Sequence, residues 1–225
     1  MGKFPSGYSC SGTTVTSSTP IFLRIALTGF KFIGEQIGFL EDKGQEDRYI
    51  FGFEESYGYL AGSYVRDKDA VVASMLICEM AAFYRTKGIS LIQARENMYK
   101  KYGVYIHSQS SFVCEGVTGM ERMKEIMSDL RTNTPKTIGG LTVTRFEDYL
   151  ASTSVDTATG AKTMLTLPKS DVLTFKLTDG ASVIIRPSGT EPKIKAYYTT
   201  TGTTKAEAAA LEKTISDDFA KILGF

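Results

Sequence analysis

The ten residues from Arg186 to Lys195, RPSGTEPKIK, bring a guanidinium, two hydroxyls and a glycine into one short stretch. An apolar run precedes the stretch and an alternating run follows it, which predicts a strand, a turn and a second strand. The planar donor fork of Arg186 suits phosphate oxygens. The turn is therefore either a phosphate cradle or an ordinary polar hairpin turn, because Pro, Ser and Gly are common in both.

Three further residues of this turn could complete a phosphate cradle. Ser188 and Thr190 each add a hydroxyl donor. Gly189 carries no side chain, so neighbouring backbone N–H groups can point into a concavity and hold an anion. The chemistry expected of the turn is thus phosphate binding.

A second polar cluster lies in the motif GFEESYG at 52–58. The first two residues of this motif end a stretch at 48–53 that is predicted to be a buried strand. Ligands often bind beyond the ends of strands in α/β sheets. The carboxylate of Glu54 could accept hydrogen bonds from sugar hydroxyls, and the hydroxyl of Ser56 could donate one. The alternative is a solvated loop.

Lys68 stands at the predicted start of a long helix over 68–86. A positive charge there opposes the helix dipole. Lys68 is therefore either an ordinary surface residue or a residue held to meet a phosphate or to donate a proton.

The bulk composition narrows the classes of partner. The 225 residues include 26 basic and 25 acidic side chains, so no net field favours nucleic acid or an anionic membrane. Three widely separated cysteines suit a reducing cytoplasm better than a disulfide framework. A single histidine excludes a multi-histidine metal site, and no apolar run of about 18 residues predicts a membrane helix.

Changes of pattern divide the chain into three parts. Residues 1–27 are rich in Ser, Thr and Gly and predict an irregular lead-in, with one apolar run at 21–27 that could be a strand. Residues 28–117 predict an α/β domain with a mixed sheet and helices. Residues 118–225 predict a smaller α+β domain, an antiparallel sheet with covering helices.

Four motifs, in order along the chain, resemble the α-D-phosphohexomutases, the phosphoglucomutase and phosphomannomutase enzymes. The turn at 186–195 resembles the phosphate-binding loop of their C-terminal domain, and 52–58 resembles their sugar-specificity loop. TGFKFIG at 28–34 resembles a third-domain loop that also touches the sugar. RDKD at 66–69 resembles the segment that places an active-site lysine.

The resemblance implies a role for each matching residue. Substrate-binding residues would be Thr28, Gly29, Glu54, Ser56, Arg186, Ser188, Gly189, Thr190 and Lys195. Lys68 would contact the reacting phosphate or assist proton transfer. Lys195 stands where many relatives have a second arginine, and a lysine supplies a charge without the donor fork.

The resemblance covers about residues 28–225, which correspond to part of the third domain and all of the fourth. The family's loop of Thr-Ala-Ser-His-Asn-Pro type and its Asp-x-Asp-Gly-Asp-Arg magnesium loop have no counterpart in the sequence. We therefore expect sugar-phosphate binding without turnover, no cofactor in this chain, and Mg²⁺ only in a full-length enzyme. The alternatives are a non-catalytic sugar-phosphate binding module and a structural fragment that pairs through a truncated sheet edge or complements the absent domains.

Overall fold

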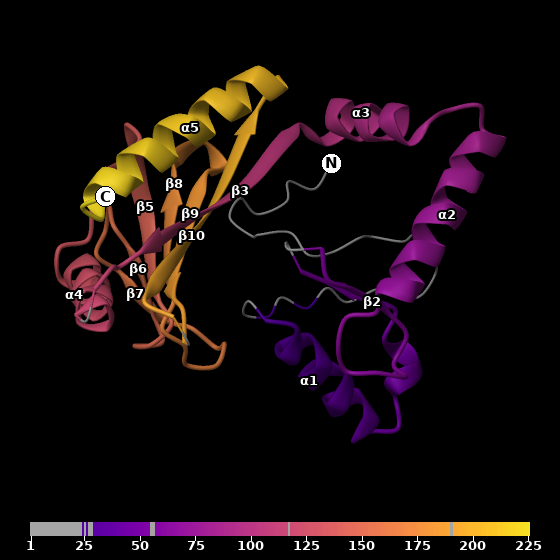
Figure 1. Ribbon diagram of the computed structural model, residues 1–225, viewed down its shortest axis with the longest axis horizontal. Coiled ribbons are helices and arrows are strands. Elements are labelled where there is room, and N and C mark those ends of the chain that lie inside the picture. The colour runs from indigo at the N-terminus through magenta and orange to yellow at the C-terminus, as the bar shows by residue number, and fades with distance from the viewer. Residues whose placement is uncertain (1–23, 25, 27–28, 55–56, 117, 190) are drawn as a thin grey trace. The chain divides into compact units, whose positions relative to one another are not determined.

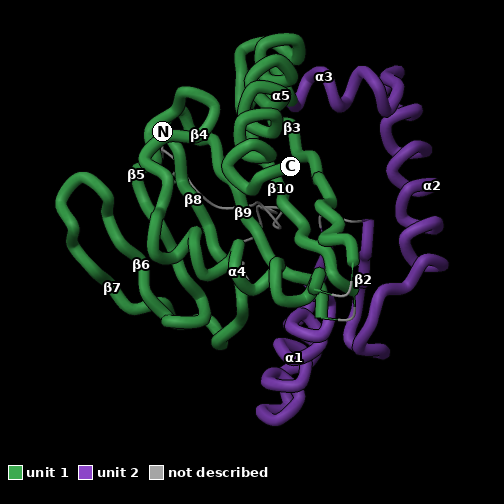
Figure 2. Tube along the Cα trace, turned by 60° about the vertical axis from the view of Figure 1, so that its left-hand side comes forward, with its two compact units in different colours: residues 1–8, 99–225 green, residues 9–98 purple. Residues whose placement is uncertain are grey.

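The computed structural model describes residues 24, 26, 29–54, 57–116, 118–189 and 191–225. The described chain divides between Met98 and Tyr99 into two compact units, with its residues from 99 to 225 in unit 1 and its residues from 24 to 98 in unit 2 (Figure 2). This division precedes the boundary at 117/118 expected from the sequence, because the strand at 104–113 pairs with the sheet of unit 1.

Unit 1 contains an eight-stranded antiparallel sheet with the strand order β3-β10-β9-β8-β5-β6-β7, and β4 pairs with β5 (Figure 1). The strands are β3 (Val104–Val113), β4 (Thr137–Ile138), β5 (Leu141–Asp148), β6 (Thr153–Asp156), β7 (Lys162–Met164), β8 (Leu173–Leu177), β9 (Ser182–Pro187) and β10 (Lys193–Gly202). The region at 151–162, expected to be a loop or a hairpin tip, forms the β6–β7 hairpin.

Two helices, α4 (Gly119–Thr132) and α5 (Lys205–Ile222), pack on the sheet of unit 1 (Figure 1). Met123 and Met127 of α4 are buried, as their helical spacing predicts, and their side chains fill the core. Phe219 of α5 lies against Phe175 of β8 with ring centroids 5.8 Å apart. Alternating residues on the strands supply the other side of this core, which confirms an α+β domain with covering helices.

The ends of α5 and α4 have identifiable polar anchors. Thr204 and Glu207 form a capping box, in which each side chain accepts a hydrogen bond from the other residue's backbone N–H. Near the end of α4, Arg131 pairs with Asp148 and Asp171. The Arg131–Asp148 pair joins α4 to β5 of the sheet, whereas the capping box closes the first turn of α5.

Unit 2 contains α1 (Phe30–Glu41), a two-stranded sheet, a second helix and most of a third. The remaining elements are β1 (Phe51–Phe53), β2 (Tyr59–Ala61), α2 (Ala70–Thr86) and α3 (Leu91–Tyr102), whose last turn belongs to unit 1. Its core consists of Phe30, Ile37 and Leu60, with Ile33 and Tyr49 packed against it. The strand predicted over 48–53 is shorter than expected, and its first residue, Phe51, is 40% exposed.

Helix α2 begins at Ala70, two residues after the predicted start at 68, because the Asp69 side chain caps it by accepting hydrogen bonds from the N–H groups of Val71 and Val72. The helix contacts β2 but buries none of its own residues. Val71, Met75 and Phe83 are 80%, 53% and 53% exposed. The expected packing of this helix on a sheet is therefore only partial within the described chain.

Candidate functional site

The predicted phosphate turn connects β9 to β10 as a tight hairpin. Arg186 lies opposite Lys195, and Pro187 lies opposite Ile194. The backbone N–H of Ser188 donates to the carbonyl of Lys193 at 2.8 Å and closes the turn. A cavity of about 250 Å³ is lined by Arg186, Pro187, Ser188, Gly189, Glu191, Lys193 and Lys195.

Arg186 supplies a buried donor at this cavity. Its Nε atom is buried and has no hydrogen-bond partner among the described residues, and its guanidinium carbon lies 5.9 Å from the ring centroid of Tyr197. A buried polar group without a partner costs about 1–3 kcal/mol. Arg186 also lines the cavity, so its guanidinium is available to an anion bound there.

Three cations and one carboxylate line the cavity. Lys193 and Lys195 add ammonium groups to the guanidinium of Arg186, and the carboxylate of Glu191 is paired with Lys193. The hydrogen bond from Lys193 lowers the pKa of Glu191 below its ordinary value. The lining therefore keeps an excess of positive charge, which favours an anion.

Two cavity residues, Glu191 and Lys193, were not assigned a role from the sequence. Both lie within the quoted turn, so their charges were visible, but their orientation depends on how the hairpin folds. Arg186, Ser188, Gly189 and Lys195 were predicted and share the cavity. Thr190, also predicted, lies outside the described residues.

The second predicted cluster lies in unit 2, where the loop between β1 and β2 faces Lys68. The N–H of Glu54 donates to the carbonyl of Gly58 at 2.9 Å. A Cβ atom at Gly58 would lie 2.5 Å from Cδ of Lys68 and 2.9 Å from Oε2 of Glu54. The absence of a side chain at Gly58 thus brings the lysine and the glutamate together, a role that the sequence interpretation missed.

Lys68 is held as a cation by its neighbours. Its ammonium donates to Asp67 at 2.9 Å and lies 5.3 Å from the ring centroid of Phe30. The hydrogen bond to Asp67, with the charge of Glu54 added, raises the pKa of Lys68. The side chain therefore stays protonated at neutral pH and offers positive charge to a ligand.

Of the other residues predicted to contact the sugar, the structure describes Gly29. Gly29 is the N-cap of α1 with a φ of 128°, a conformation that favours glycine. Thr28 and Ser56 lie outside the described residues. The phosphate turn and the Glu54–Lys68 cluster belong to different compact units.

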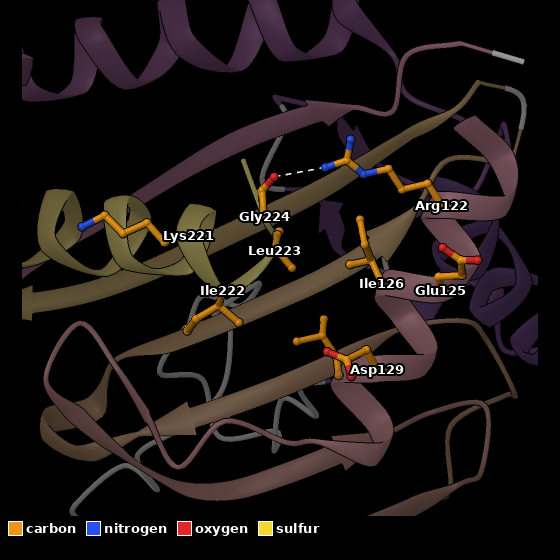
Figure 3. Close-up of a pocket in the computed structure, with 9 residues that line it drawn as sticks. Arg122, Glu125, Ile126, Asp129, Lys221, Ile222, Leu223 and Gly224 are labelled. Atoms are coloured by element: carbon orange, nitrogen blue, oxygen red, sulfur yellow. Dashed lines mark hydrogen bonds between the residues drawn. The ribbon is translucent and has the colours of Figure 1, made fainter. Parts of the chain in front are cut away.

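A larger cavity of about 340 Å³ lies between α4 and the C-terminal end of α5 (Figure 3). Arg122 and Lys221 offset Glu125 and Asp129 in its lining, and Arg122 donates to the carbonyl of Gly224 at 3.0 Å. The cavity shares no residue with the phosphate turn. Its charge is balanced and none of its described lining residues has a buried donor without a partner, so it is the weaker candidate although it is the larger of the two.

Within the placed ranges, no three His, Cys, Asp or Glu side chains gather as a metal-binding group. Across the same ranges, no helix has the length and apolar character needed to span a membrane.

Comparison with known proteins identifies the family. Residues 14–102 match the family model described as phosphoglucomutase/phosphomannomutase, alpha/beta/alpha domain III. Residues 127–217 match the model of the C-terminal domain of the same enzymes. The first match begins at residue 14, earlier than residue 28, where the quoted motifs begin.

Individual relatives agree with these matches. Over 171 residues the chain is 41% identical to a phosphoglucomutase of Staphylococcus aureus strain bovine RF122 / ET3-1 and 40% identical to that of strain MRSA252. Each alignment covers 76% of this chain and 30% of the relative, so the chain spans about a third of the length of these proteins.

A solved structure has a similar fold. The open form of pp63/parafusin, a phosphoglucomutase from Paramecium, aligns with a TM-score of 0.57 at 20% identity and covers 88% of this chain and 33% of its own. This likeness concerns the fold alone. The two matched domains, in the family's order, confirm the resemblance drawn from the motifs: the chain belongs to the phosphoglucomutase/phosphomannomutase family and comprises domain III and C-terminal domain sequence.

Proposed function

We propose that this chain forms the sugar- and phosphate-binding part of a cytoplasmic phosphohexomutase. Such an enzyme interconverts sugar 1-phosphate and 6-phosphate through a phosphoserine and a bisphosphate intermediate. The observation that carries the proposal is Arg186, which lines a cavity with Lys193 and Lys195 and whose buried Nε has no hydrogen-bond partner among the described residues. In this reaction the cavity would bind the phosphate that is not being transferred.

The phosphate turn would hold that distal phosphate by charge and by hydrogen bonds. Arg186 supplies the donor fork, while the turn at 188–190 supplies hydroxyl and backbone donors. Lys195 lies opposite Arg186 in the hairpin and adds a point charge. Because an ammonium lacks the planar fork, this grip is looser than one made by two arginines.

The cluster in unit 2 would hold the sugar. Glu54 would accept hydrogen bonds from hydroxyls of a hexose or pentose phosphate, with Thr28, Gly29 and Ser56 as further contacts. Lys68 would meet the reacting phosphate as a cation, because its raised pKa makes it a poor proton donor at neutral pH.

We further propose that the chain binds without turning its ligand over. Phosphoryl transfer depends on a positioned nucleophile and on metal and cationic stabilisation of oxygen charge. The printed sequence has no stretch of the Thr-Ala-Ser-His-Asn-Pro or Asp-x-Asp-Gly-Asp-Arg type. The bond-breaking chemistry would then belong to parts of a full-length enzyme beyond these two domains.

Calorimetry with glucose 6-phosphate, inorganic phosphate and glucose tests the binding proposal. A charge-assisted hydrogen bond contributes about 1.5–3 kcal/mol, so a millimolar Kd is expected for glucose 6-phosphate and for inorganic phosphate. Arg186→Ala should abolish this binding, whereas Arg145→Ala, which removes an exposed positive charge from β5, should not. Glu54→Ala should weaken glucose 6-phosphate more than inorganic phosphate.

Two results would count against the proposal. If calorimetry shows no saturable heat up to several millimolar phosphate, the proposal that the chain binds phosphate is wrong. Turnover of glucose 1-phosphate by the purified chain, with magnesium and a bisphosphate activator, would overturn the proposal that the chain has no mutase activity.

A second candidate is a structural fragment that associates through unit 2. The observation that favours it is the exposed apolar surface of α2, in which Val71, Met75 and Phe83 are each more than half exposed. Such a fragment would pair with a second copy or complement the absent domains in trans. A strict monomer in light scattering would count against pairing between copies.

A further inference from the structure

We infer that Gly119 is a positioning residue for the phosphate turn. It lets the start of α4 lie against Cys114 and Pro192, and so fixes the half of the turn that carries Glu191 and Lys193. This inference rests on the proposed phosphate-binding function and adds to it a residue outside the turn.

The first contact joins the turn to the end of β3. The backbone N–H of Cys114 donates to the carbonyl of Pro192 at 2.7 Å. The bond lies one step beyond the last register pair of β3 and β10, Val113 with Lys193. Cys114 is fully buried, so this bond is shielded from competing water. The sheet pairing thereby continues into the turn.

The second contact places the start of α4 directly on the same two residues. A Cβ atom at Gly119 would lie 2.0 Å from the carbonyl oxygen of Cys114 and 3.1 Å from Cβ of Pro192. The nearer atom is backbone, so it cannot move aside as the end of a flexible side chain can. Any side chain at position 119 must therefore displace Cys114, Pro192 or the helix itself.

A displacement of Pro192 would reach the cavity. Pro192 lies between Glu191 and Lys193, whose backbone groups are joined by a hydrogen bond of 2.7 Å from the N–H of Lys193 to the carbonyl of Glu191. The carbonyl of Lys193 in turn accepts the N–H of Ser188 that closes the turn. These bonds link Pro192 to both ends of the cavity lining.

A matched pair of glycine substitutions tests this role by calorimetry with inorganic phosphate. Gly119→Ala should lower phosphate affinity by about tenfold or more, because small misplacements of binding groups carry large costs. The control is Gly202→Ala in the same unit, where a Cβ atom would lie 2.8 Å from the backbone nitrogen of Ala208. Both variants should lose stability, but Gly202→Ala should keep the wild-type phosphate Kd. Equal affinity of Gly119→Ala and wild type would overturn the inference.

Amide hydrogen exchange tests the same role without any ligand. Exchange at the Ser188 amide should be faster in Gly119→Ala than in wild type and unchanged in Gly202→Ala. If the wild type binds no phosphate, the proposed function fails, yet faster Ser188 exchange in Gly119→Ala would still support positioning. Unchanged Ser188 exchange would overturn it.

A wild-type measurement covers the case in which Gly119→Ala does not fold. Phosphate should slow exchange at the Cys114 amide, which donates to Pro192. It should leave the Gly139 amide unchanged, because that amide donates to Asp218 at 2.6 Å and lies outside the turn. Equal Cys114 exchange with and without phosphate would contradict the inference.

Discussion

The carboxylate of Glu191 pairs with the ammonium of Lys193 two residues later, and both side chains line the cavity of the phosphate turn. An anion that enters this cavity therefore meets a lysine whose charge is already partly compensated. The pair also keeps Glu191 ionised at neutral pH, because the hydrogen bond from Lys193 lowers its pKa. Glu191 thus weakens the field that the three cations create.

Glu191→Gln should tighten the binding of inorganic phosphate. It removes one negative charge from the lining and leaves Lys193 free to contact the anion, which should lower the Kd roughly fivefold. Calorimetry against Glu121→Gln, an exposed change on α4, would measure the difference. Weaker binding in Glu191→Gln would instead mean that the ion pair holds the turn in its binding shape.

Gly58→Ala should impair the sugar-side cluster while leaving the phosphate turn intact. The added Cβ would lie 2.5 Å from Cδ of Lys68, so the lysine must move away from Glu54. We expect glucose 6-phosphate to bind more weakly and inorganic phosphate to bind as in wild type, measured by calorimetry. Gly38→Ala is the matched control, because a Cβ atom there meets nothing within 4 Å. A parallel loss for both ligands would place the effect in folding rather than in the cluster.

Arg131→Ala should destabilise unit 1. Its guanidinium contacts Asp148 at 3.1 Å and pairs with Asp171, and Asp148 is only 7% exposed. Removing one partner of a buried pair costs about 3 kcal/mol, because the remaining charge stays buried. Denaturant unfolding followed by circular dichroism measures this loss. Arg95→Ala, at the exposed Arg95–Glu96 pair, should change stability by less than about 1 kcal/mol. Equal effects of the two variants would disprove a structural role for the Arg131 pair.

The capping box of α5 should make stability depend on acid pH. Hydrogen bonds from Thr203 and Thr204 lower the pKa of Glu207 from its ordinary value of 4.5. A carboxylate whose pKa is lower in the folded state stabilises the fold above its unfolded pKa. That contribution is lost as the pH falls through the lower folded value.

Thermal unfolding of Glu207→Gln at pH 7 and pH 3 measures this contribution. The variant should be less stable than wild type at pH 7, and this difference should shrink toward pH 3, because acid protonates wild-type Glu207 and removes its ionic contribution. Ser90→Ala is the control, since it removes a neutral hydroxyl that accepts from the N–H of Gln93 at the start of α3, and it should lose about 1 kcal/mol at both pH values. A Glu207→Gln deficit of equal size at both pH values would contradict the ionic contribution.

Much of the fold followed from local patterns. Apolar residues recur at helical spacing over 120–131 and 208–222, where α4 and α5 form, and apolar runs lie on either side of Thr178–Gly180, where β8 pairs with β9. Helical and strand periodicities are set by neighbours a few residues apart, so they can be recognised in the sequence. The residue types of the phosphate turn and four motifs in order likewise sufficed to indicate the family.

Long-range partners were decided only by the tertiary structure. The domain predicted over 28–117 includes the residues of β3, whereas β3 pairs with β10, about ninety residues later, in the other unit. The close contacts at the two sites could not be predicted from the sequence either. Gly119 lies against Pro192, which is distant in the chain, and Gly58 lies against Lys68, which the chain brings back to it.

The sequence by itself therefore determined which groups could bind a phosphate and a sugar, because chemistry resides in residue types. Only the tertiary structure decided that the Glu191 carboxylate pairs with a cation of the turn. It also decided that the N–H of Cys114 bonds to the turn at the carbonyl of Pro192. The physical reason is that the fold of the hairpin sets where the Glu191 side chain lies, and that strand pairing joins Cys114 to Pro192 across a sequence separation that leaves no local periodic signal.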